Sequence, residues 1–76
     1  MRTLMVWFFE RHAELLRIET THEQGVFVLK IYREHGEVQT ETFRSEVACH
    51  KRLERLERQL RADCWALRLV APLRSP

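Results

Sequence analysis

Two cysteines and four histidines are the side chains of this chain best suited to bind a metal or to attack a substrate. Structural zinc sites usually show ligand pairs at short spacing, such as Cys-x-x-Cys, and no such pair occurs here. Cys49 and His50 are neighbours, but adjacent side chains on a helix point about 100° apart. Cys49 and Cys64 fall on a stripe of apolar helix positions, where a free cysteine packs as a small hydrophobe. We therefore expect no metal, no other cofactor, and a structural role for both thiols.

Catalytic residue patterns are also missing from the sequence. Cys–His chemistry requires an exposed thiol in contact with an imidazole, and no local motif surrounds either cysteine. The two glycines, Gly25 and Gly36, stand eleven positions apart, so the chain has no glycine-rich phosphate-binding loop. We therefore predict that the protein is not an enzyme.

Basic residues gather in the second part of the chain. Residues 1–46 carry six Lys/Arg and eight Asp/Glu, whereas residues 47–76 carry seven Lys/Arg and three Asp/Glu. The overall net charge of +2 therefore combines an acidic N-terminal part with a basic C-terminal part. Glu54 and Glu57 interleave with the basic residues, as on an ordinary solvated helix face. Nucleic-acid binding is therefore the alternative function, and its candidate phosphate contacts lie on one predicted helix: Lys51, Arg52, Arg55, Arg58 and Arg61.

The length of 76 residues limits the chain to one small domain with a marginal core. An apolar fraction of 45% is too high for intrinsic disorder, and no apolar run approaches the ~20 residues that span a bilayer. The N-terminal residues do not resemble a secretory leader. We expect a cytoplasmic protein with no membrane association and with reduced cysteines. Because small domains usually need a disulfide, a metal or a partner, a partner is the simplest source of extra stability.

The strongest turn signal is His35-Gly36, which separates two segments of strand character, Gly25 to Arg33 and Glu37 to Phe43. We predict a β-hairpin here and leave its register open. A two-residue loop pairs Lys30 with Glu41, whereas a three-residue loop places Phe27 opposite Phe43.

The segment from residue 4 to residue 18 has two readings. The apolar run 4–9 and the alternating stretch 14–21 are each typical of a strand, which predicts a second hairpin region before Gly25. A single helix from Leu4 to Ile18 is the competitor, since residues 10–17 contain good helix formers. We favour two strands, because the apolar residues of such a helix would point nearly all round it.

A helix from Ser45 to about Ala62 is the clearest predicted element. Ser45 is a good N-cap, and Glu46 suits the positive end of the helix dipole. The predicted buried stripe consists of Cys49, Leu53, Leu56, Leu60 and Cys64. After the helix, residues 65–70 form a short final strand or a docking tail. We expect one domain over residues 1–70 and a flexible tail over residues 71–76.

These elements predict an α+β fold with two layers: a three- to four-stranded antiparallel sheet of β-hairpins, followed by one C-terminal amphipathic helix. At the level of fold, this layout resembles the dimeric single-stranded-DNA-binding coactivator domains. That resemblance implies a homodimer and a nucleic-acid partner, although the predicted sheet lacks the basic character of that family.

One helix can cover only one face of such a sheet, but the predicted strands carry apolar residues on both faces. Soluble monomeric proteins rarely leave a large apolar sheet face exposed to water, so such a face usually binds a protein partner. We therefore predict a non-enzymatic protein-interaction or homodimerisation module. Its candidate interface residues are Trp7, Phe9, Val26, Val28 and Tyr32.

Overall fold

A five-stranded antiparallel sheet and one helix make up the described chain, so the fold is α+β. The computed structural model describes residues 2–72. The elements in chain order are β1 (Arg2–Arg11), β2 (Glu14–Glu23), β3 (Val26–Arg33), β4 (Val38–Phe43), α1 (Glu46–Ala62) and β5 (Ala66–Ala71). The strands lie in the order β4-β3-β2-β1-β5.

The prediction of two strands over residues 4–18 is confirmed, since this segment forms most of β1 and β2. His12 and Ala13 connect them in left-handed conformations, with φ of 49° and 65°. Gln24 and Gly25 connect β2 to β3 in the same way, with φ of 48° and 79°. Two consecutive left-handed residues give the tight turn whose twist matches that of paired strands. The three strands β1, β2 and β3 therefore follow one another as a meander.

The β3–β4 hairpin adopts the register with the three-residue loop. Phe27 lies opposite Phe43, and Lys30 faces Thr40 rather than Glu41. The Arg33 N–H donates to the Glu37 carbonyl at 3.1 Å, which closes the loop. Gly36 supplies the positive φ, +80°, that the loop requires.

The helix α1 begins where the sequence predicts. The Ser45 hydroxyl accepts a hydrogen bond from the Ala48 N–H at 3.0 Å, and the last helical residue is Ala62. The prediction that Cys64 continues the buried stripe is wrong. Cys64 is exposed and left-handed, with φ of 67°, and Trp65 is buried in its place. The buried helix residues are Cys49, Leu53, Leu56 and Leu60.

Two features of the predicted architecture need correction. The sheet has five strands rather than three or four, and the helix lies between β4 and β5 rather than at the C-terminal end. The helix carries the chain from the β4 edge to the opposite edge, where β5 pairs with β1. Ala71 belongs to β5, while residues 73–76 of the expected tail lie outside the described residues.

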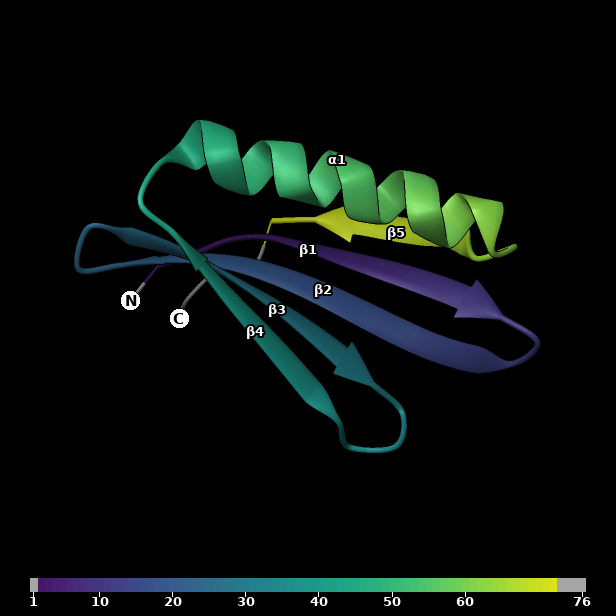
Figure 1. The fold of residues 1–76 in the computed structure, drawn as a ribbon. Helices are drawn as coiled ribbons and strands as arrows, with labels where there is room; N and C mark the ends of the chain where they lie inside the picture. Colours follow the sequence, from purple (N-terminus) through teal and green to yellow (C-terminus); the bar gives the residue numbers. More distant parts are fainter. Residues whose placement is uncertain (1, 73–76) are drawn as a thin grey trace.

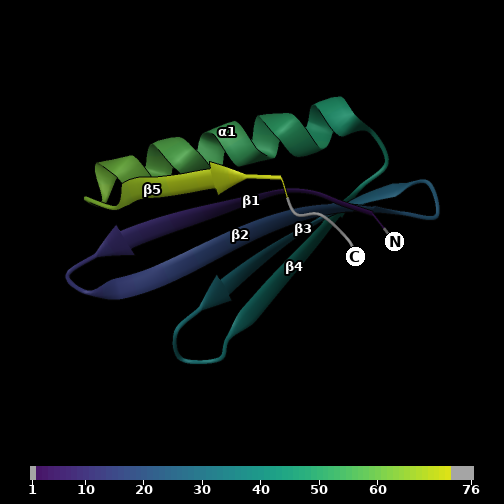
Figure 2. The same ribbon diagram turned by 180° about the vertical axis from the view of Figure 1, so that it is seen from behind.

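The main buried cluster lies between the helix and one face of the sheet, while Val6, Thr21 and Val28 are buried on the other face. In both views α1 stays on the same side of the strands, and within residues 2–72 no helix lies on the other side (Figures 1 and 2). The sheet contributes buried residues at alternate positions, and Trp65 closes the cluster near the end of α1. The sheet side of this core consists of Phe9, Leu16, Ile18, Leu29 and Ile31, with Trp7, Phe27, Phe43 and Leu67 packed around them.

Candidate functional site

The sheet face turned away from α1 is the first candidate site, and we call it the open face. Strand alternation assigns residues to it, because neighbours in a strand point to opposite faces. Phe8 and Arg17 are the neighbours of the core residues Phe9, Leu16 and Ile18 and are paired with each other across β1 and β2. Tyr32 of β3 continues this row opposite Arg17.

One row of the open face crosses all five strands, and we call it the central row. Following the pairing from edge to edge, it consists of Leu69, Phe8, Arg17, Tyr32 and Val38. Leu69 and Val38 lie at its two ends and are 52% and 50% exposed. Leu15, two residues before Arg17 on β2 and on the same face, is 52% exposed. Large apolar side chains thus stand in solvent at several points of one face.

A β-bulge places the β5 end of the central row. Phe8 pairs with Leu69 but Phe9 pairs with Leu67, so Arg68 is the extra residue. A bulge of this kind turns two consecutive side chains to one face. The Arg68 Nε lies 3.0 Å from the Glu10 Oε1, which places Arg68 on the open face beside Leu69. Without the bulge, β5 would present only one of these two residues there.

Arg17 lies in the middle of the central row. Its guanidinium is stacked on a ring, and its charge is compensated by a carboxylate. Its guanidinium carbon lies 4.1 Å from the centre of the Tyr32 ring. Its Nε also lies 3.0 Å from the Glu19 Oε2, so the charge is compensated on the same strand. A stacked guanidinium of this kind is weakly hydrated and is well suited to an interface.

The charges of the open face balance one another. Its described side chains include three basic and three acidic residues, namely Arg17, Lys30, Arg68, Glu10, Glu19 and Glu23. Arg17–Glu19 and Arg68–Glu10 are ion pairs, and Lys30 stands opposite Glu19 in the register. A balanced face lacks the positive potential that draws a phosphate backbone. It instead suits a protein surface that also carries both signs.

The predicted interface residues are divided between the two faces. Trp7 and Phe9 belong to the helix-covered side, where Phe9 is 1% exposed. Val26, Val28 and Tyr32 lie on the open face, although Val28 is itself buried at 6% exposure. The exposed large apolar side chains of the open face, Leu15, Val38 and Leu69, were not among the predicted interface residues. The alternation of side chains along β2 and β4 was the available signal for Leu15 and Val38.

The predicted phosphate contacts on α1 do not form one surface. Arg52 is held by Glu41, and Arg61 pairs with Glu57 at 3.0 Å. The other three, Lys51, Arg55 and Arg58, are exposed and follow a four-three spacing, which places them on the helix side away from the buried stripe. Within the described part of the chain, no ion pair involves these three.

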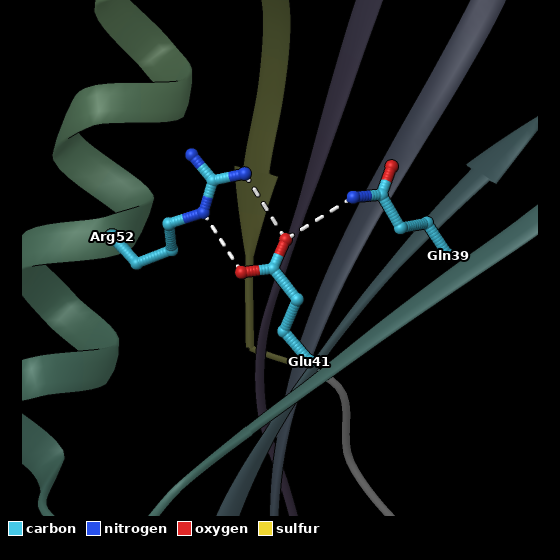
Figure 3. Close-up of polar contacts among 3 residues, drawn as sticks. All are labelled: Gln39, Glu41 and Arg52. Carbon is cyan, nitrogen blue, oxygen red and sulfur yellow. Dashed lines mark hydrogen bonds and ion pairs between the residues drawn. The ribbon is translucent and has the colours of Figure 1, made fainter.

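Glu41 and Arg52 tie the β4 edge of the sheet to the helix (Figure 3). The Arg52 Nε donates to the Glu41 Oε1 at 2.8 Å, and its Nη2 donates to the Oε2 at 3.1 Å. The Gln39 amide also donates to the Glu41 Oε2, at 3.3 Å. The hydrogen bonds from Arg52, with its charge, hold the pKa of the Glu41 carboxyl below its ordinary value of 4.5, against the effect of burial. The same contact raises the pKa of Arg52.

This pair predicts an acid-sensitive part of the stability. A carboxyl whose pKa is lower in the folded state contributes stability that is present above pH 4.5 and is lost as the pH falls through the folded pKa. We expect the wild type to be more stable than Glu41→Gln at neutral pH, and the difference to shrink in acid. Urea unfolding of both proteins from neutral pH to pH 3 measures it. A difference that stays constant over this range would contradict the assignment.

The two cysteines do not come together in the described chain. Cys49 is buried under the helix, and Cys64 is exposed beyond its end. No group of three or more His, Cys, Asp or Glu side chains is placed to hold a metal ion within residues 2–72. The helix described there is too short and too polar to cross a membrane.

Comparison of the chain with protein-family models, with curated proteins and with solved structures found no match.

Proposed function

We propose that this protein is a non-enzymatic self-association module in which two copies pack their open faces together about a two-fold axis. The observation that carries the proposal is the central row, with exposed Leu69 and Val38 at its ends and the Arg17–Tyr32 stack inside it. No element within residues 2–72 covers this row. Exposed large apolar side chains gathered on one sheet face are typical of a protein interface.

Size and charge support a second copy as the partner. The molecule extends 37 × 28 × 21 Å, and a stable interface takes about 800 Å² from each partner, which a sheet face of these dimensions accommodates. A two-fold axis brings each patch against itself, so the face must be self-complementary. Its equal numbers of acidic and basic side chains, with Glu19 opposite Lys30, support such self-complementarity. A cytoplasmic location, as the sequence predicts, fits a domain that uses association rather than a disulfide for stability.

Leu15→Lys is the variant that tests the open face. Leu15 lies on an inner strand, so its side chain reaches a partner only across the face and not along a sheet edge. It stands opposite Glu10, and the new cross-strand pair of opposite charges preserves the strand. A lysine side chain placed in a packed interface loses hydration and replaces an apolar contact, so the substitution should weaken dimerisation by roughly tenfold or more.

Sedimentation equilibrium from low to high micromolar concentration measures this effect. We expect the wild type to approach twice its monomer mass of 9.2 kDa and Leu15→Lys to shift toward monomer. Val47→Lys is the matched control, because Val47 is 64% exposed on the helix, away from the open face. A monomeric wild type at high micromolar concentration, or equal effects of the two substitutions, would refute the proposal.

The alternative is nucleic-acid binding by the outer side of α1. The unpaired, exposed trio Lys51, Arg55 and Arg58 is the observation in its favour. Three phosphate contacts predict weak binding with a shallow dependence on salt. Titration of single- and double-stranded oligonucleotides at two salt concentrations tests it, and the triple change of these residues to glutamine should abolish any salt-sensitive signal.

A further inference from the structure

A cavity lies under the first turns of α1, on the opposite side of the sheet from the proposed dimer face. Its volume is about 310 Å³. The strands β1, β2 and β3 supply its floor through Met5, Trp7, Thr20 and Phe27, and the helix supplies its roof through Glu46, Cys49, His50 and Leu53. The cavity therefore belongs to the same layer as the core but continues beyond it toward the start of the helix.

The inner part of this cavity is apolar and partly aromatic. Cys49, Leu53 and Thr20 are buried, and the rings of Trp7 and Phe27 complete the wall. His22 stacks on Phe27 with ring centres 4.3 Å apart and planes within 2°, which fixes one aromatic wall in place. For comparison, an apolar cavity of about 150 Å³ can hold a benzene ring. The present volume thus accommodates a fused pair of rings.

The rim of the cavity carries negative charge. The His50 Nε2 contacts the Glu54 Oε1 at 3.1 Å, whereas Glu46 forms no ion pair with any described residue. Burial raises the pKa of the Cys49 thiol, and the Glu46 and Glu41 carboxylates raise it further. The thiol that lines the cavity is therefore neutral at physiological pH, and it experiences the field of nearby carboxylates. An anionic ligand would meet repulsion at this rim, and a cationic one attraction.

We propose that this cavity binds a small aromatic amine, with the fused rings between Trp7 and Phe27 and the protonated amine beside Glu46. The aromatic walls provide offset or edge-to-face contacts for the rings. The exposed carboxylate sets the sign of the charge that the ligand carries. The site uses neither the central row nor any other residue of the open face, so it operates in monomer and dimer alike.

Tryptamine and indole-3-acetate are the test ligands, because they share one ring system and differ in the sign of the charge. We expect tryptamine to bind about three- to tenfold more tightly at low salt, given that Glu46 is exposed and partly screened. Titration followed by amide chemical shifts measures both affinities and locates the site. Shift changes should cluster on the start of α1 and on the facing strands. Binding of neither ligand, or equal or tighter binding of indole-3-acetate, would overturn the proposal.

Three variants separate the ring site from the charge. Cys49→Leu adds volume to the roof and should reduce the affinity for both ligands by roughly tenfold or more. Glu46→Gln should bring the two affinities to within about twofold of each other while leaving the rings bound. Val47→Leu, one position away on the exposed side and not part of this cavity, should change neither affinity. If Cys49→Leu fails to fold, Thr20→Ile fills the same space from the floor. Unchanged affinity in a folded filling variant would refute the site.

Discussion

Replacing Phe9 with alanine should remove about 3–5 kcal/mol from the free energy of unfolding. Phe9 is 1% exposed and is one of the four largest side chains that are fully buried. It lies in the cluster that joins the sheet to the helix. A chain of 76 residues is expected to have a total stability of roughly 4–11 kcal/mol, at about 0.05–0.15 kcal/mol per residue. The substitution should therefore leave much of the population unfolded at 37 °C.

Phe8→Ala is the matched control for this prediction. Phe8 is the same residue type on the same strand, but it lies on the open face and is only partly buried. Its loss in a dilute, monomeric sample should cost less than half of the Phe9 effect, because part of its ring remains in water in the folded monomer. Urea unfolding followed by circular dichroism at low protein concentration compares the two. Equal losses would mean that both faces of the sheet are equally buried, against the one-sided core described above.

Local sequence signals accounted for the parts of the fold that depend on neighbouring residues. The extent of α1 follows from the Ser45 cap and from the spacing of Cys49, Leu53, Leu56 and Leu60, which all lie within one segment. The β3–β4 hairpin follows from the turn around Gly36. Its register was left open, because both loop lengths offered a favourable cross-strand pair. The Phe27–Phe43 pair prevailed, and both rings pack against the core.

Local signals left residues 65–70 as a short final strand or a docking tail, and the pairing of this fifth strand was beyond their reach. Residues 66–71 pair with β1, more than fifty positions earlier in the chain, as the Glu10–Ala66 partners illustrate. Nothing within the segment indicates which edge of the sheet it joins. The same is true of its bulge at Arg68, because a bulge is defined by the mismatch with a partner strand. The position of the helix between β4 and β5 follows only once this long-range pairing is known.

The candidate site was predicted in part for a similar reason. Alternation within β3 correctly groups Val26, Val28 and Tyr32 on one face, but it does not say on which face Trp7 lies. That assignment depends on register between strands. Trp7 pairs with Ile18, and Ile18 pairs with Ile31, so all three point to the helix. The interface prediction combined residues from both faces because strand registers are long-range properties.

The helix ends at Ala62 as predicted, but the predicted burial of Cys64 was wrong because no glycine marks the turn after the helix. The Trp65 N–H donates to the Leu60 carbonyl at 2.9 Å, and the Cys64 N–H donates to the Arg61 carbonyl at 3.1 Å. This pair of bonds is the Schellman arrangement, in which a left-handed residue follows the helix and the next residue packs back on its last turn. Glycine usually occupies the left-handed position and marks the end in a sequence. Here Cys64 occupies it, with φ of 67°, so the apolar spacing that continues to Cys64 does not place its side chain in the core.

Replacing Trp65 with alanine should consequently cost about 3–5 kcal/mol of stability. Trp65 is buried in the core cluster, and the guanidinium carbon of Arg11 lies 4.5 Å from the ring centre. The Arg11 Nη1 also donates to the Asp63 carbonyl at 3.0 Å, so the same arginine holds the ring and the end of the helix. Because β5 begins at the residue after Trp65, loss of the ring should loosen the pairing of β5 with β1.

Two measurements distinguish this role from a general loss of packing. Urea unfolding followed by circular dichroism gives the stability, and hydrogen exchange gives the protection of single amides. In Trp65→Ala, the amides that join β5 to β1 should lose protection to a greater extent than those between β2 and β3, because the edge strand opens locally.

Cys64→Ala is the control, since it changes an exposed neighbour and keeps a side chain at the left-handed position. It should shift stability by less than about 0.5 kcal/mol. If the two variants have the same stability, Trp65 does not anchor the fifth strand. If Trp65→Ala loses protection uniformly across all strands, the ring supports the whole core instead, and β5 needs no anchor of its own.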